Sequence, residues 1–163
     1  VLEAFAHMPE YRLAICGKVS PEDPFVRAYK KELYETPNIK TYGFVDPAST
    51  LFKKLYSESL GIVFVSASEG HPTRVVVSMN AGLIPIVSRE TGIVTGDFGI
   101  TLDEVSVDTV IGAVRALSQE PEERLRARTL HTWQYAREHH TREKFAQAFA
   151  AFVDELEQKH KRL

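Results

Sequence analysis

Short apolar runs alternate with stretches of helical periodicity along the first part of the chain. We expect helices before the first of these runs, from about Pro24 to Tyr34, and after Asp46-Pro47 through Leu51 and Leu55. The apolar runs predict four strands: YRLAIC (11–16), IKTYGFV (39–45), GIVFVS (61–66) and LIPIVS (83–88). Strands that alternate with helices favour an α/β fold, a Rossmann-like parallel sheet with helices on both faces.

A helical extension is expected after the last strand. The stretch RETGIVTGDFGITL (89–102) is rich in glycine and is predicted to be mostly loop. Ser106 with Asp108, then Pro121, then Thr141 with Glu143 suit the starts of three successive helices. We expect the last helix to pack on its own domain through an apolar stripe of Phe145, Phe149, Phe152, Val153 and Leu156.

The clearest sign of a ligand site lies directly after the run GIVFVS. A continuous apolar run of this length is typical of a strand that is buried on both faces of a parallel sheet. Residues after such a strand lie where open α/β sheets bind ligands, and Glu69 and Gly70 have this position. A helix is expected from about Thr73 to Ala81, with Pro72 in its first turn and Gly82 as a left-handed end. The start of that helix favours an anion such as a diphosphate.

The same region resembles the donor-binding signature of family 4 (group 1) glycosyltransferases, which have the GT-B fold. These enzymes transfer a sugar from a nucleotide diphosphate sugar to an acceptor. Glu69 matches the first of two signature glutamates, whereas Val77 stands at the second and Ser78 replaces the usual alanine. A valine cannot accept the hydrogen bond that the second glutamate receives from the ribose. The matching residues are Ser68-Glu69-Gly70-His71-Pro72, Met79, Ala81-Gly82 and Pro85-Ile86-Val87.

The resemblance implies a role for each residue of the candidate site. Glu69 is implied as the catalytic carboxylate, which hydrogen bonds the donor sugar. The reaction is implied to be retaining hexosyl transfer, with the nucleotide diphosphate sugar as substrate, no cofactor and no obligatory metal. Residues implied to bind the donor are Gly17, Lys18, Gly43, Phe44, Gly70, His71, Pro72, Thr73 and Val77.

Structural roles explain several of these residues as well. Glu69 and Thr73 could cap the helix that follows them, and His71 and Lys18 could be solvated surface residues. Glu90, in the later glycine-rich stretch, is a candidate for the ribose contact that the second signature position lacks. The sequence leaves these alternatives open.

Composition and charge disfavour several other classes of protein. A formal net charge of −2 without a basic block gives a nucleic-acid partner little support. No apolar stretch approaches the roughly 20 residues of a membrane span, and no signal peptide opens the chain. The single cysteine, Cys16, favours a reducing, cytoplasmic compartment and is expected to be a small core residue. The turn GKVSPED (17–23) matches neither dinucleotide nor P-loop patterns, and no residue spacing suggests a metal site.

We therefore expect residues 1–163 to form one domain, the C-terminal donor-binding half of a GT-B glycosyltransferase of polysaccharide biosynthesis. Because the chain starts in a helix at Val1, the N-terminal acceptor domain and the first strand of this domain are expected to be absent. The isolated piece is then inactive, and membrane contact occurs only through the missing part, if at all. The alternative is a degenerate GT-B-like binding or structural module without donor chemistry, for which Val77 is the main argument. A phosphoacceptor receiver domain is disfavoured, because Gly17-Lys18 follow the first strand where acidic residues are needed.

Overall fold

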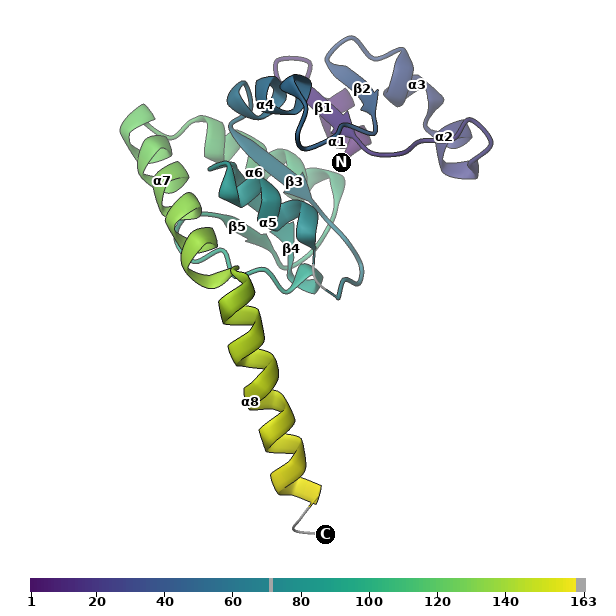
Figure 1. Ribbon diagram of the computed structural model, residues 1–163. Helices are drawn as coiled ribbons and strands as arrows, with labels where there is room; N and C mark the ends of the chain where they lie inside the picture. Colours follow the sequence, from purple (N-terminus) through teal and green to yellow (C-terminus); the bar gives the residue numbers. More distant parts are fainter. Residues whose placement is uncertain (71, 161–163) are drawn as a thin grey trace.

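The computed structural model describes residues 1–70 and 72–160. It is an α/β fold in which every paired strand runs parallel to its neighbour (Figure 1). The predicted Rossmann-like class and the four predicted strands are confirmed, and a fifth strand is added. The strands are β1 (Leu13–Cys16), β2 (Ile39–Gly43), β3 (Gly61–Phe64), β4 (Ile84–Ser88) and β5 (Ile100–Leu102).

The strands form two sheets, one of β1 and β2 and the other in the order β3-β4-β5. Within the described residues β1 pairs only with β2, and β3 pairs only with β4, so each has one open edge. Side chains of both sheets nevertheless pack against the same core cluster, with Leu13 and Ile15 from β1 and Val63 from β3. The two sheets therefore share one hydrophobic core.

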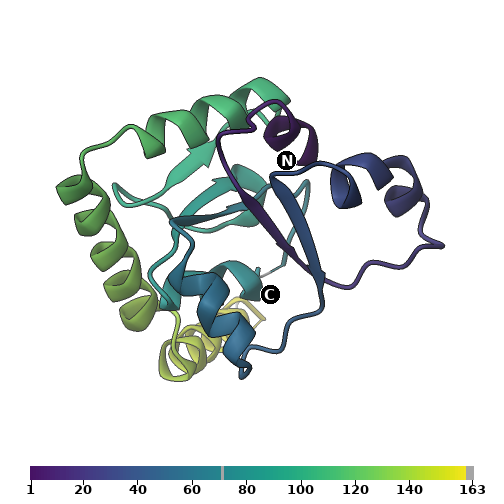
Figure 2. The same cartoon turned by 90° about the horizontal axis from the view of Figure 1, so that it is seen from above.

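β4 is the centre of the larger sheet, and all five of its residues are buried. Ile84 and Ile86 face a core formed with α1 (Leu2–Ala6) and α6 (Val107–Ser118). Val87 faces the opposite core, formed with α5 (Thr73–Asn80) and α7 (Glu122–His139). This alternation places helices on both faces of the sheet, as Figure 2 shows from above.

Capping residues explain where several helices begin. Asp23 accepts a hydrogen bond from the backbone N–H of Phe25 and starts α2 (Pro24–Ala28). The helix predicted from Pro24 to Tyr34 is divided at Tyr29, where α3 (Lys30–Tyr34) begins. α4 (Thr50–Ser57) is capped by Ser49, and α6 is capped by Ser106 as predicted.

The stretch 89–102 is more ordered than predicted. A 3₁₀ turn, η1 (Arg89–Thr91), follows β4, and residues 100–102 form β5 instead of loop. The apolar positions of this short strand are few, so its pattern alone could not distinguish it from loop; pairing with β4 stabilises it.

Two expectations about burial are wrong. Cys16 is exposed and is not a core residue. The residues of β3 are all half-buried, whereas a strand buried on both faces was expected. Cys16 ends β1, and both β1 and β3 have an open edge, with which no strand of the described residues pairs.

α8 (Arg142–His160) extends away from the rest of the molecule (Figure 1), and none of its residues is buried. The prediction that its apolar stripe packs on its own domain is wrong: Phe145 is 72% exposed and Phe149 is 57% exposed. Periodicity reveals that a helix has an apolar face, but it does not reveal which surface covers that face.

Candidate functional site

The predicted site residues lie in the loops that follow the strands, at the carboxyl edge of each sheet. Gly17 and Lys18 follow β1, and Gly43 ends β2 directly before Phe44. The structure brings these two turns together, because the Gly17 N–H donates a hydrogen bond of 2.8 Å to the Gly43 carbonyl oxygen. Gly43 has a φ of +69°, which explains the glycine at this position.

The loop with Glu69 follows β3 and is exposed from Ala67 to Gly70. Within the described residues the Glu69 carboxylate takes part in no hydrogen bond or ion pair. It does not cap α5, so this alternative role receives no support. A Cβ atom at Gly70 would meet no protein atom within 4 Å, so packing does not require glycine there. This part of the loop is open to solvent or to a ligand.

α5 begins directly after this loop. Pro72 is buried and is the N-cap of the helix instead of its first helical residue, and its carbonyl oxygen accepts from the N–H of Val75 at 2.8 Å. Thr73, the first residue of α5, is exposed, and Val77 lies half-buried one turn later. Gly82 has a φ of +84° after the helix, as predicted. His71 lies outside the described residues.

Two serines that the sequence analysis did not single out connect the loop with the central strand. The buried Ser88 hydroxyl accepts a hydrogen bond of 2.9 Å from the Ser66 N–H and donates one of 2.7 Å to the Ser66 carbonyl oxygen. Ser66 in turn donates its hydroxyl to the Ser68 carbonyl oxygen at 3.1 Å. The sequence does contain a feature from which this contact could be predicted, since the runs GIVFVS and LIPIVS, which form neighbouring strands, both end in serine.

Charged groups also gather after the strands. Arg89 follows β4 and forms an ion pair with Asp103, which follows β5. Glu90 is exposed beside Arg89, and Lys18 is exposed after β1. Partial burial raises the pKa of the Cys16 thiol, which disfavours the thiolate form.

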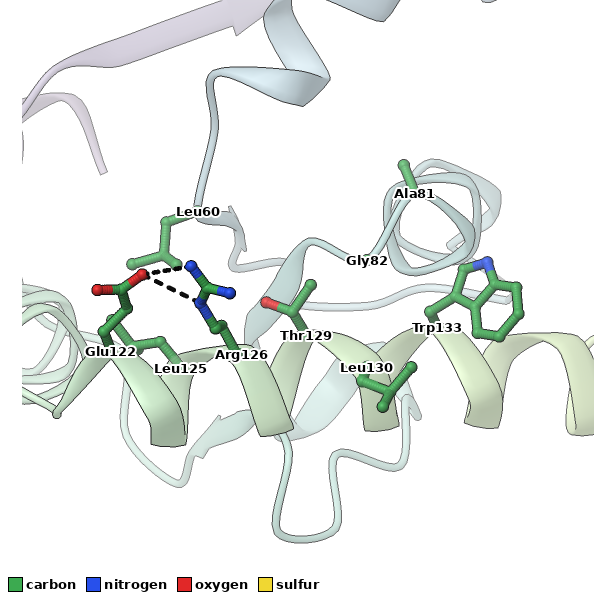
Figure 3. A pocket seen from close by; sticks show the side chains of 9 residues that line it. All are labelled: Leu60, Ala81, Gly82, Glu122, Leu125, Arg126, Thr129, Leu130 and Trp133. Atoms are coloured by element: carbon green, nitrogen blue, oxygen red, sulfur yellow. Dashed lines mark hydrogen bonds and ion pairs between the residues drawn. The ribbon is translucent and has the colours of Figure 1, made fainter.

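A separate pocket of about 490 Å³ opens at the other end of the larger sheet (Figure 3). Leu60, directly before β3, and Gly82, shortly before β4, contribute to its wall. The rest of the wall comes from α7, where Trp133 lies opposite Ala81. None of the predicted site residues lines this pocket, so it is distinct from the Glu69 loop.

Within the described residues no group of three or more His, Cys, Asp and Glu side chains is placed to hold a metal ion. Among the helices of residues 1–70 and 72–160, none is both long enough and apolar enough to cross a bilayer.

No protein-family model and no curated protein sequence matches this chain. Two similar solved structures are those of WaaG, a glycosyltransferase involved in lipopolysaccharide biosynthesis, and of the GtfA/B complex. The WaaG match has a TM-score of 0.63 and 18% identity and covers 83% of this chain and 37% of WaaG. The GtfA/B match has a TM-score of 0.65 and 22% identity and covers 94% of this chain and 31% of the other.

The chain therefore spans about a third of the length of these two structures. At such low identity the likeness concerns the fold alone. Both similar structures are of the GT-B type. The parallel sheets and flanking helices of this chain have the Rossmann-like fold of one half of a GT-B molecule.

Proposed function

We propose that this chain is the donor-binding half of a family 4 type glycosyltransferase, which binds a nucleotide diphosphate sugar for retaining hexosyl transfer in polysaccharide biosynthesis. The observation that carries the proposal is the position of Glu69 and Gly70 in an exposed loop between β3 and the start of α5, within a GT-B half. Ligands of open α/β sheets bind at such carboxyl ends of strands.

The diphosphate is assigned to the start of α5. The helix dipole and the backbone N–H groups of a first turn favour an anion. Thr73 and Arg74 are exposed in this turn and supply a hydroxyl and a cation, while exposed Lys18 adds a second cation after β1. These groups suit a diphosphate better than a neutral ligand.

The sugar and the base are assigned to opposite sides of the diphosphate. The Glu69 carboxylate accepts hydrogen bonds from sugar hydroxyls, and the departing phosphate deprotonates the acceptor, so the proposed mechanism requires no metal and no cofactor. Phe44 is 67% exposed after the left-handed turn at Gly43 and offers an apolar surface to the base. Val77 cannot bind the ribose by a hydrogen bond, and exposed Glu90 is the proposed replacement.

An acceptor domain and one further strand are proposed to complete the protein. The open edges of β1 and β3 support a parallel strand between the two sheets, because both sheets already line one core. Without the acceptor domain the half-site cannot exclude water or orient an acceptor, so the 163-residue chain is proposed to be inactive. The exposed, unpaired thiol of Cys16 supports a reducing, cytoplasmic location, with any membrane contact made by the acceptor domain.

The second candidate is a GT-B-like binding or structural module that has lost donor chemistry. Val77 at the position of the second signature glutamate is the observation that favours it.

Calorimetry separates the two candidates. The chain is titrated with UDP, GDP, ADP and TDP and with the glucose conjugate of each. We expect a donor-binding half to bind the nucleotides of one base and not the others. The Glu69→Gln substitution should then lower the affinity for the nucleotide sugar about tenfold and leave the affinity for the nucleotide diphosphate unchanged. The control is Glu58→Gln, an exposed glutamate that precedes β3. Absence of binding to the whole panel supports the degenerate module.

A further inference from the structure

The backbone ladder between β3 and β4 ends before the Glu69 loop begins. Its last paired residues are Phe64 and Val87. Ser66, two residues further, is half-buried, so its N–H and carbonyl oxygen still need hydrogen-bond partners. The Ser88 hydroxyl supplies both partners, at 2.9 and 2.7 Å. The Ser88 side chain thus continues the hydrogen bonding between the two strands as far as Ser66.

Ser88 is itself held firmly. Its exposed fraction is 0%, and its backbone pairs with Leu102 of β5. Its carbonyl oxygen accepts a hydrogen bond of 2.7 Å from the hydroxyl of Thr91, a side chain that is 2% exposed. The hydroxyl that hydrogen bonds the Ser66 backbone therefore belongs to β4, the strand whose residues are all buried.

The two hydrogen bonds from Ser88 fix the position of Ser66, and so the direction in which the chain continues toward Glu69. The Ser66 hydroxyl binds the Ser68 carbonyl oxygen, which is adjacent to Glu69 in the chain. At the other end of the loop, Pro72 is buried at the start of α5. Between these two fixed points residues 67–70 are exposed, so their position depends on the two ends.

We propose that Ser88 is a positioning residue: its hydroxyl fixes the first residue of the Glu69 loop and thereby the distance between the Glu69 carboxylate and the start of α5. Ser88 is buried and does not touch the donor. This inference rests on the proposed donor-binding function, in which the sugar must reach Glu69 while its diphosphate occupies the start of α5.

The test compares Ser88→Ala with Ser78→Ala. Both serines are fully buried, and the Ser78 hydroxyl also makes two hydrogen bonds, one of 2.9 Å to the Arg74 carbonyl oxygen and one of 2.9 Å with the Tyr56 hydroxyl. The control therefore loses a similar number of buried hydrogen bonds without touching Ser66. Ser88→Cys, which keeps the shape with a weaker hydrogen-bonding group, gives a second variant if Ser88→Ala does not fold.

Two readouts are measured on the 163-residue chain. By NMR, the Ser66 amide of Ser88→Ala exchanges about tenfold faster than in the wild type, and the order parameters of residues 67–70 fall. By calorimetry, the affinity for the nucleotide sugar falls about tenfold, while that for the nucleotide diphosphate changes less than about twofold. Ser88→Cys changes both quantities in the same direction, and Ser78→Ala changes neither.

Unchanged Ser66 exchange in Ser88→Ala and Ser88→Cys overturns the positioning role. So does faster exchange with unchanged affinity for the sugar conjugate. If the wild type binds no member of the nucleotide panel, the proposed function has failed, and the exchange result still decides whether Ser88 fixes the loop.

Discussion

Arg128 joins three segments of the chain through one guanidinium group. Its Nε and Nη2 atoms each donate to the Glu120 carboxylate at 2.8 Å, and Nη1 donates to the Asp97 carbonyl oxygen at 2.7 Å. The side chains of Arg128 and Glu120 are only 13% and 17% exposed. A bidentate pair with this little solvent contact contributes more to stability than a surface ion pair. It holds α7 against the loop that leads into β5.

We expect Arg128→Met to lower the free energy of unfolding by about 1–3 kcal/mol, because Glu120 loses its bidentate partner and keeps only the ion pair with Arg124 at 3.3 Å. Urea denaturation measures the loss. The control is Arg126→Met, which breaks an ion pair with Glu122 whose side chains are 79% and 77% exposed, and should cost less than about 0.5 kcal/mol. Equal losses in the two variants would contradict the assignment.

The same pair predicts a dependence on pH. The hydrogen bonds from Arg128 hold the pKa of Glu120 below its usual value. A carboxylate with a lowered folded pKa stabilises the fold above its unfolded pKa of about 4.3 and loses this contribution as the pH falls through the folded value. The stability difference between wild type and Arg128→Met should therefore shrink below about pH 4.

Residue roles were predictable where they depend on local sequence. Ser106 as a helix cap and Gly82 as a left-handed helix end follow from neighbouring residues, and both are observed. The role of Ser88 depends on the register between β3 and β4, which no local pattern contains. Cys16 was misplaced for a similar reason, since its exposure depends on whether a strand lies beside β1.

At the scale of elements, strand positions followed from short apolar runs and helix starts from capping residues. The break at Tyr29 between α2 and α3 and the short strand β5 were missed, because neither changes the apolar pattern enough. The candidate site likewise has a part that the sequence pattern predicts and a part that it does not. Glu69 was placed correctly after β3, but which loop residues contact one another required the fold.

The exposure of α8 predicts that the rest of the chain folds without it. Because none of its residues is buried, deletion of residues 141–163 should change the free energy of unfolding of the remaining chain by less than about 1 kcal/mol. Circular dichroism should show a loss of helical signal, and urea denaturation should show an unchanged cooperative transition. Loss of that transition in the shortened chain would mean that α8 packs on the domain in solution.

At the scale of the whole molecule, the division into two sheets predicts unequal stability. β4 is flanked by two strands and fully buried, whereas β1 and β2 form a two-stranded sheet, which is weak by itself. In hydrogen exchange the amides of β4 should open only with global unfolding, and those of β1 and β2 at a lower free energy. Equal protection of both sheets would show that they unfold as one cooperative unit.

Trp133 is the one tryptophan of the sequence, and its place on α7 decides what its emission can report. The indole lines the same pocket as Ala81, which follows α5 at its far end from Thr73, and the Arg137 guanidinium lies 4.8 Å from the ring. A helix of eight residues separates the two ends by about 12 Å. Tryptophan fluorescence therefore reports on the surroundings of α7 and should change little when a nucleotide binds at Thr73. A titration followed by this signal alone would show no binding even when the protein is saturated.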